Sequence, residues 1–189
     1  MKVLNIPATL EFNKNLLKKI KIPNKFEVVT TIQYLKEIKK HFPKAKQILG
    51  CSKIKKSNTY LYIGTGKFHP LRLIKYTKNI YILNPETKQF YKLSQNEITN
   101  YKKLLKGKLN KFYAAKSYGI IVSTKPGQHN LKAATQLQTK LKNSFIFLTN
   151  NVNTKEFENF PQIKLWINTA CPRIEHKNII NLEDLPIKI

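Results

Sequence analysis

Cysteine is scarce in this sequence. Only Cys51 and Cys171 occur among the 189 residues, and they stand far apart in the chain. Two such thiols do not make the disulfide framework of a small secreted protein, so they are either buried thiols or groups with metal-binding or redox chemistry. Long apolar runs are absent as well: no segment reaches the length that spans a bilayer, and the N-terminus has no signal-peptide pattern. We therefore expect a cytoplasmic protein with no membrane-spanning segment.

Acidic residues and arginine are also few. Ten Asp and Glu face 35 Lys and Arg, which gives a formal net charge of +25, and only Arg72 and Arg173 are arginines. Such a charge raises the question of an anionic partner, such as RNA, an acidic protein or a membrane surface. Base readout and phosphate clamps favour the planar fork of arginine, whereas lysine is a compact, hydrated charge. The lysines are therefore interpreted first as solvated surface, and nucleic acid is not the expected partner.

The apolar residues that are present form short runs. Hydrophobic residues make up 41% and aromatic residues 11% of the chain, which indicates that it folds. Continuous β-branched runs alternate with lysine-rich amphipathic stretches, a pattern typical of parallel sheets flanked by helices. The sequence therefore predicts an α/β fold. Strands are expected at 2–6, 26–32, 59–64, 79–84, 118–124, 144–149 and 164–168, with a short one in "KQIL" before Cys51, and helices within 13–20, 34–42, 94–116 and 128–142.

The longest helical stretch, at about 94–116, is expected to connect two small sheets. It follows one set of strand candidates and precedes a second set, and Gly107 within it is expected to bend or break the connector. We place the domains at 1–108 and 109–189. The similar strand and helix rhythm of the two halves indicates related units.

Polar and glycine-rich loops follow several of the predicted strands. In open parallel sheets, ligands gather beyond the carboxyl ends of the strands. Of the four histidines, His69 comes directly after a strand and is the most interesting, although "GTGKFHP" fits neither a dinucleotide fingerprint nor a P-loop and is equally compatible with a tight turn into a helix. The candidate loops are "TTIQY" at 30–34, "LGCSK" at 49–53, "GTGKFHP" at 64–70, "STKPGQHN" at 123–130 and "TACPR" at 169–173.

The two cysteines lie in two of these loops, one in each half of the chain. A thiolate near helix N-termini and lysines has a lowered pKa, as metal ligation requires. Two cysteines alone are a weak metal signal, because structural zinc takes four ligands and iron–sulfur clusters take three or four thiolates. A cluster built on Cys51 and Cys171 would therefore need a further ligand.

Taken in order and spacing, these loops resemble the archaeal diphthamide-synthesis enzyme, the radical 3-amino-3-carboxypropyl transferase. The resemblance covers essentially the whole chain, and "GTGKFHP" with "TACPR" is its most distinctive part. That family has three related small α/β domains, each giving one cysteine to a single [4Fe-4S] cluster. The cluster binds S-adenosylmethionine, whose 3-amino-3-carboxypropyl group is transferred as a radical to a histidine of translation elongation factor 2. The resemblance implies that this chain consists of two Rossmann-like domains, each a parallel sheet flanked by helices, similar to the second and third domains of the family.

The resemblance also implies roles for individual residues. Cys51 and Cys171 would be the second and third cluster ligands, and Arg173 would bind the methionyl carboxylate as a planar pair. No catalytic side chain beyond the cluster is assigned. Thr65 and Lys67 depart from the family, which usually has an acidic residue and an arginine there. The residues implied to line the S-adenosylmethionine pocket are Thr30, Thr31, Gln33, Gly64, Gly66, Phe68, His69, Gln128 and Arg173.

The family's first domain and its cysteine have no counterpart in this sequence. We therefore expect one half of a split enzyme, completed by a separate chain that carries the first domain, with a dimer of the completed enzyme as the final assembly. An acidic partner chain, or the acidic surface of the elongation factor, would account for the +25 charge. The alternatives are a non-catalytic scaffold or regulatory subunit of the same system and, less favoured, a lysine-rich RNA-binding α/β protein.

Overall fold

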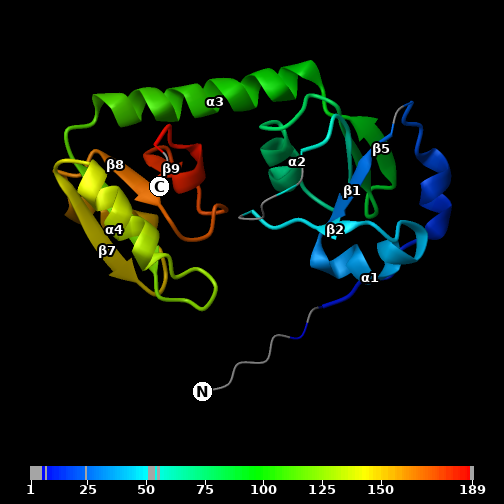
Figure 1. Cartoon of the computed structure of the whole chain (residues 1–189), viewed down its shortest axis with the longest axis horizontal. Helices are drawn as coiled ribbons and strands as arrows, with labels where there is room; N and C mark the ends of the chain where they lie inside the picture. Colours follow the sequence, from blue (N-terminus) through cyan, green and yellow to red (C-terminus); the bar gives the residue numbers. More distant parts are fainter. Residues whose placement is uncertain (1–5, 7, 24, 51–53, 55, 188–189) are drawn as a thin grey trace. The chain divides into compact units, whose positions relative to one another are not determined.

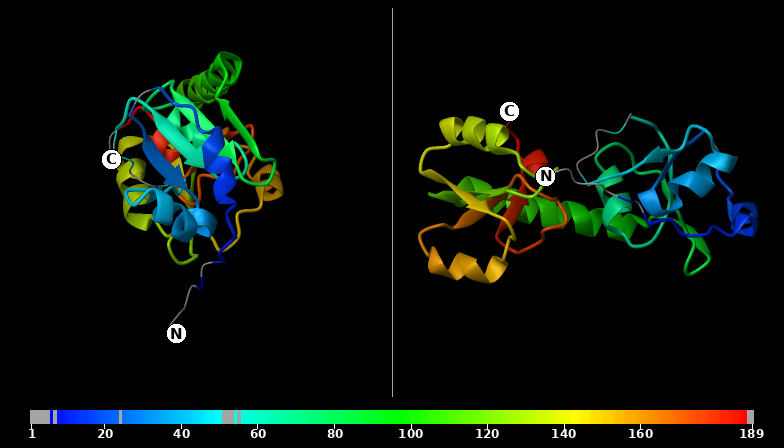
Figure 2. Two further views of the ribbon diagram at one scale, coloured as in Figure 1. Left: turned by 90° about the vertical axis from the view of Figure 1, so that its right-hand side faces the viewer. Right: turned by 90° about the horizontal axis from the view of Figure 1, so that it is seen from below.

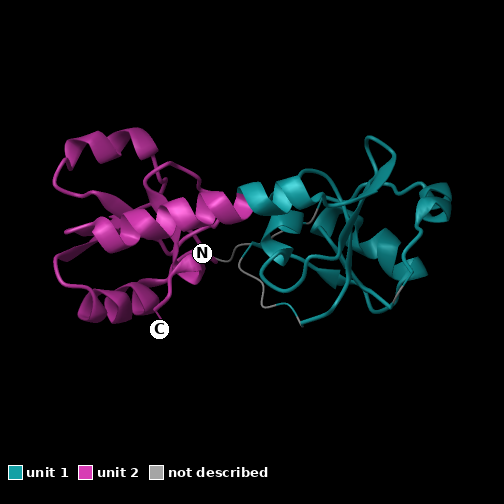
Figure 3. Cartoon of the chain, turned by 90° about the horizontal axis from the view of Figure 1, so that it is seen from above, with its two compact units in different colours: residues 1–100 teal, residues 101–189 magenta. Residues whose placement is uncertain are grey.

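The computed structural model describes residues 6, 8–23, 25–50, 54 and 56–187 (Figure 1). Residue contacts divide the chain into two compact units, Met1–Asn100 and Tyr101–Ile189 (Figure 3). The helix α3 (Gln95–Ala114) belongs to both units in sequence. The predicted domain boundary between residues 108 and 109 falls within this helix and stays a prediction.

Unit 1 is built on a five-stranded sheet in the order β2-β1-β3-β4-β5. The first four strands in this order are parallel, and β5 pairs antiparallel with β4 at the edge. The strands are β1 (Glu27–Thr30), β2 (Lys46–Gln47), β3 (Tyr60–Ile63), β4 (Ile80–Asn84) and β5 (Gln89–Lys92), and the helices are the 3-10 helix η1 (Lys14–Lys19), α1 (Ile32–His41) and α2 (Phe68–Leu73).

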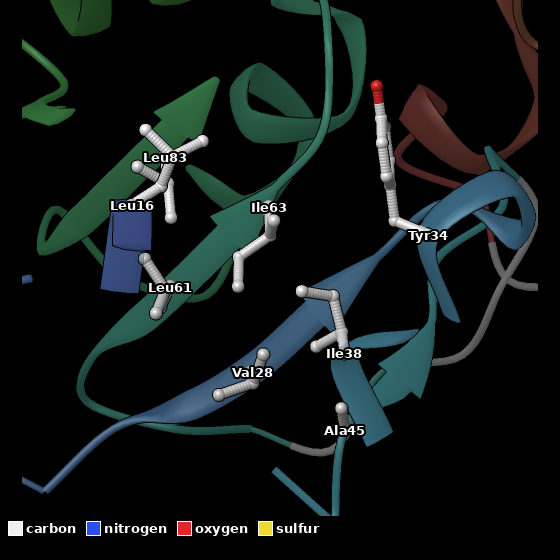
Figure 4. Close-up of a cluster of buried hydrophobic side chains, with 8 residues drawn as sticks. All are labelled: Leu16, Val28, Tyr34, Ile38, Ala45, Leu61, Ile63 and Leu83. Carbon is white, nitrogen blue, oxygen red and sulfur yellow. The ribbon is translucent and has the colours of Figure 1, made fainter. Parts of the chain in front are cut away.

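Helices cover both faces of this sheet because the strands are apolar on both sides. One face packs against η1 and α1 through the cluster drawn in Figure 4. The opposite face carries Tyr60 and Tyr62, whose rings contact Tyr76 and His69 of the segment that contains α2. Each fully buried valine, leucine or isoleucine side chain of this cluster contributes roughly 1.5–3 kcal/mol to folding. The cluster consists of Leu16, Val28, Tyr34, Ile38, Ala45, Leu61, Ile63 and Leu83.

Unit 2 is built on a four-stranded, fully parallel sheet in the order β7-β6-β8-β9. Figure 2 shows α4 and the 3-10 helix η2 on opposite faces of this sheet. The elements are β6 (Tyr118–Ser123), α4 (Leu131–Lys140), β7 (Ser144–Thr149), η2 (Thr154–Asn159), β8 (Leu165–Asn168), β9 (Ile179–Asn181) and the 3-10 helix η3 (Leu182–Asp184).

The two faces of this second sheet are packed differently. On the α4 side, aliphatic residues of the strands meet α4 and Phe112 from the last part of α3. On the η2 side the core is aromatic: the Trp166 ring stacks on Phe157 with centroids 4.1 Å apart and an interplanar angle of 13°. Gly119 of the neighbouring strand lies directly beside the Trp166 ring and leaves no room for a Cβ atom. Position 119 therefore requires glycine, because the indole ring of Trp166 occupies the space of a side chain there.

One expectation about the elements needs correction, and two strands were not predicted. The connector α3 runs unbroken through Gly107. A single glycine inside a long helix costs only about 1 kcal/mol of stability, and the backbone hydrogen bonds of the helix continue past it. The strands β5 and β9, which are only four and three residues long, were not predicted. Of the strand predicted at 2–6, residues 2–5 lie outside the described part of the chain.

Candidate functional site

The strand order of unit 1 places two of the predicted loops side by side. β1 and β3 are adjacent, but the chain leaves β1 towards β2 and leaves β3 towards β4. Such a reversal of strand order opens a crevice at the carboxyl ends of the two strands. The two strand ends are joined by the Thr30 hydroxyl, which donates to the carbonyl oxygen of Ile63 at 2.6 Å. Thr30 is fully buried, so its side chain holds the two loops together.

The loop "GTGKFHP" is shaped by its glycines and by the tyrosine beneath it. Gly64 and Gly66 have φ angles of 157° and 71°. The Tyr62 hydroxyl donates to the carbonyl oxygen of Thr65 at 2.9 Å and so ties the loop to the end of strand β3. A Cβ on Gly64 would stand 2.6 Å from that hydroxyl oxygen. The close approach fixes glycine at this position.

The loop continues into α2, which begins with Phe68 and His69. The His69 ring lies 5.1 Å from the Phe68 ring and 6.0 Å from the Tyr62 ring, measured between centroids. The Arg72 guanidinium stands 5.7 Å from the Phe68 centroid, and Arg72 is only 9% exposed. Sequence reasoning missed Arg72. It is one of only two arginines and follows Phe68 by four residues, a spacing that on a helix can place a cation over an aromatic ring.

Lys67 anchors the same loop to the start of α3. Its ammonium group donates to the Glu97 carboxylate at 2.6 Å. Glu97 also accepts from the backbone N–H and the hydroxyl of Ser94, at 2.9 and 2.8 Å, and the two residues form a capping box. The hydrogen bond from Lys67, followed by those from Ser94, lowers the pKa of Glu97, and the bond to Glu97 raises the pKa of Lys67.

Unit 2 repeats the arrangement. β6 and β8 are adjacent, and the chain leaves them in opposite directions towards β7 and β9. The loops at 123–130 and 169–173 therefore meet at the carboxyl edge of the sheet. The Thr169 hydroxyl donates to the carbonyl oxygen of Ile121 at 2.8 Å, and the Asn130 side chain donates to that of Thr169 at 2.8 Å. The two loops are thus bonded to each other and to the sheet.

Buried amides hold the backbone of Cys171. The Asn168 side chain, only 2% exposed, donates to the carbonyl oxygen of Cys171 at 2.9 Å and accepts from the N–H of Ala170 at 2.9 Å. It also donates to the side-chain oxygen of Asn181 at 2.8 Å. The thiol of Cys171 is half-buried and is not in a disulfide. Sequence reasoning missed these amides; the available signal, an asparagine at the end of an apolar strand and three residues before a cysteine, marks the position of Asn168 but not its bonds.

The other predicted residues of unit 2 differ in exposure. Gln128 is half-buried in a turn where its N–H donates to the carbonyl oxygen of Lys125 at 3.0 Å, whereas Arg173 is exposed. Cys51 lies outside the described residues. Within the part of the chain that the structure describes, no group of three or more His, Cys, Asp or Glu side chains could hold a metal ion.

A family model for diphthamide synthesis proteins matches residues 2–181. The chain belongs to the diphthamide synthesis family. This confirms the resemblance inferred from the motifs, and with it the α/β fold of parallel sheets flanked by helices. None of the helices in the described residues is long and apolar enough to cross a membrane.

Relatives in this family are longer than the chain. It is 35% identical over 197 residues to 2-(3-amino-3-carboxypropyl)histidine synthase of Methanocaldococcus jannaschii, covering 92% of this chain and 56% of the relative. It is 29% identical over 182 residues to the enzyme of that name from Pyrococcus horikoshii, covering 82% and 52%. The crystal structure of Dph2 from Pyrococcus horikoshii with a 4Fe-4S cluster superposes with a TM-score of 0.73 and 26% identity, over 90% of this chain and 59% of that one. The chain spans about half the length of these relatives.

Proposed function

We propose that this chain is part of a [4Fe-4S] enzyme that transfers a 3-amino-3-carboxypropyl group from S-adenosylmethionine to a histidine of translation elongation factor 2. The observation that carries the proposal is Cys171, a cysteine outside any disulfide whose backbone carbonyl accepts from buried Asn168 at the point where strand order reverses. Support comes from relatives named as the histidine synthase and from a similar structure that contains a 4Fe-4S cluster.

Cys171 and Cys51 would supply two thiolates to the cluster. Half-burial suits Cys171 to this role, because a ligating thiol must face the metal while its backbone stays fixed. Three thiolates leave one iron open to substrate, and the chain contains two cysteines. We propose that a further α/β domain, outside these residues, supplies the third thiolate. When bound and reduced, the cluster would supply the electron that cleaves a C–S bond of S-adenosylmethionine.

The remaining pocket residues would bind and orient S-adenosylmethionine. Thr31 and Gln33, half-buried at the start of α1, would donate hydrogen bonds, while buried Thr30 positions them through its bond to Ile63. Arg173 would pair with the methionyl carboxylate. The glycines would let the ligand approach the backbone closely. The full proposed set is Thr30, Thr31, Gln33, Gly64, Gly66, Phe68, His69, Gln128 and Arg173.

The decisive experiment is anaerobic reconstitution with iron and sulfide, with this chain alone and together with a candidate partner chain. We expect visible cluster absorption and S-adenosylmethionine cleavage only with the partner. Cys51→Ala and Cys171→Ala should each abolish both signals, and exposed Thr124→Ala, at the same sheet edge as Cys171, should leave them unchanged. Failure of the pair to form a cluster, or an intact cluster in Cys171→Ala, would overturn the proposal.

The same experiment separates the remaining alternatives. A cluster without S-adenosylmethionine cleavage, in the presence of a reductant, would indicate a scaffold or regulatory subunit. Tight binding of generic RNA with a steep salt dependence would indicate the RNA-binding alternative. Light scattering of the reconstituted pair would test the proposed dimer of the completed enzyme, which predicts twice the mass of one pair.

A further inference from the structure

We propose that the open edge of β5 in unit 1 binds an extended acidic peptide segment of a partner protein, which adds to the sheet as a further strand. The surface uses no residue of the proposed S-adenosylmethionine pocket. The proposed surface is independent of the proposed function, because strand register, a groove and charge define it.

The register of β5 shows which backbone groups face outward. Tyr91 stands opposite Ile82, and the N–H of Leu93 donates to the carbonyl oxygen of Ile80 at 2.8 Å. In an antiparallel pair, every second residue exchanges hydrogen bonds with its partner. Tyr91 therefore bonds inward to β4, and the backbone N–H and C=O groups of Phe90 and Lys92 point away from it. In the described residues, β5 ends the sheet on this side.

A groove lies along this open edge. It has a volume of about 570 Å³ and is bounded on one side by β5 with the residue before it, and on the other by the last residue of η1 and the segment that follows. The Lys19 ammonium group already donates to the carbonyl oxygen of Lys88, just before β5, at 2.8 Å. The outer side of the strand thus accepts hydrogen bonds. The residues that line the groove are Lys19, Lys21, Lys88, Gln89, Phe90 and Tyr91.

The charge of the groove selects an acidic occupant. Three of its six lining residues are lysines, and none is acidic. Glu86, in the turn before β5, does not line it. A peptide strand places alternate side chains on the same face, so glutamate or aspartate at every second position would reach Lys19 and Lys21 together. The chain's net charge of +25 would speed the encounter with such a segment.

The aromatic residues favour a peptide over RNA. Phe90 stacks on Tyr81 with centroids 5.9 Å apart and an interplanar angle of 10°, and the Lys92 ammonium group stands 5.6 Å from the Tyr81 centroid. These rings are engaged within the sheet, whereas single-stranded RNA needs rings presented for base stacking. No arginine lines the groove. An open strand edge, by contrast, is matched by the backbone of an extended peptide.

The test uses the full chain and a fluorescent peptide of alternating glutamate and valine, followed by fluorescence anisotropy. We expect saturable binding that weakens with salt. The same peptide N-methylated at alternate residues keeps its charge but loses the backbone N–H donors on the edge that would face β5. It should bind at least about tenfold more weakly. Equal binding of the two peptides would overturn the proposal, because it would show charge attraction alone.

Protein variants locate the surface. Lys19→Glu with Lys21→Glu should weaken binding by at least about tenfold, whereas Lys14→Glu with Lys18→Glu makes the same charge change on exposed η1 residues outside the groove and should have a much smaller effect. Lys92→Pro removes an outward N–H without removing a bond to β4, and should weaken binding with little change in thermal unfolding. Equal effects of the two charge pairs, or an RNA oligonucleotide that displaces the peptide at equal concentration, would overturn the proposal.

Discussion

At the scale of single residues, Gly64 decides the shape of the "GTGKFHP" loop. Its φ of 157° is rarely adopted by other residues, and an added Cβ would stand 2.6 Å from the Tyr62 hydroxyl oxygen. We expect Gly64→Ala to lower the free energy of unfolding by about 1–3 kcal/mol, because Tyr62 must shift and lose its bond to Thr65. Urea denaturation followed by circular dichroism measures this change.

Gly107→Ala is the matched control. Gly107 lies in α3 with nothing within 4 Å of an added Cβ, so the same substitution should raise the free energy of unfolding by about 0.5–1 kcal/mol. Opposite signs at the two glycines are the expected result. A neutral Gly64→Ala variant would contradict the close approach to Tyr62.

The sequence predicted where the polar residues gather but not what each one contacts. The loop at 30–34 is predicted from its place at a strand end and the role of Thr30 from the family resemblance, yet neither shows that the Thr30 hydroxyl bonds a carbonyl group in a different strand. Asn168 was missed because its function depends on two bonds to the "TACPR" loop that only the folded backbone creates. Strand ends can be read from local apolar runs, whereas hydrogen-bond partners depend on non-local register.

At the scale of elements, the start of α3 is coupled to the loop after β3. The lowered pKa of Glu97 means that its contribution to stability is present above the ordinary value of 4.5 and is lost as pH falls through the lowered pKa. The raised pKa of Lys67 means that the stabilisation contributed by its protonated ammonium group is present below the ordinary value of 10.5. It is lost only as pH rises above that value, through the raised pKa. The stabilisation by the pair is therefore largest between these limits.

We expect Glu97→Gln to lower the free energy of unfolding by about 1 kcal/mol at neutral pH, and the difference from the parent chain to shrink below pH 4.5. Unfolding in urea across a pH series measures it. Ser94→Ala removes part of the cap but keeps the Lys67 ion pair, so its cost should persist further into acid. A Glu97→Gln cost that stays constant into acid would contradict the assignment.

The elements that sequence reasoning missed are short and held by non-local pairing. β5 has polar ends and four residues, and its position depends on the turn after β4, where the Asn84 side chain accepts from the N–H of Glu86 at 2.9 Å. The strands that were predicted, such as β3 and β6, are apolar along most of their length because both faces are covered.

At the scale of the whole molecule, the net charge of +25 opposes the compact state through self-repulsion. We expect the thermal unfolding midpoint to rise as sodium chloride increases from low to physiological concentration, because salt screens repulsion over distances of about 8–10 Å. Differential scanning calorimetry measures the rise. Lys102→Glu with Lys106→Glu reduces the charge on exposed residues of α3 and should make the rise smaller. A midpoint that is independent of salt would contradict the expectation.

The burial of Arg72 has a practical consequence for chemical labelling. Of the two arginines in the chain, Arg72 is enclosed against Phe68 and Arg173 is exposed. A dicarbonyl reagent that reacts with guanidinium groups would therefore modify the folded chain at one position, two residues from Cys171. Protection of that position would report occupancy of the Cys171 loop without a reporter group introduced by mutation.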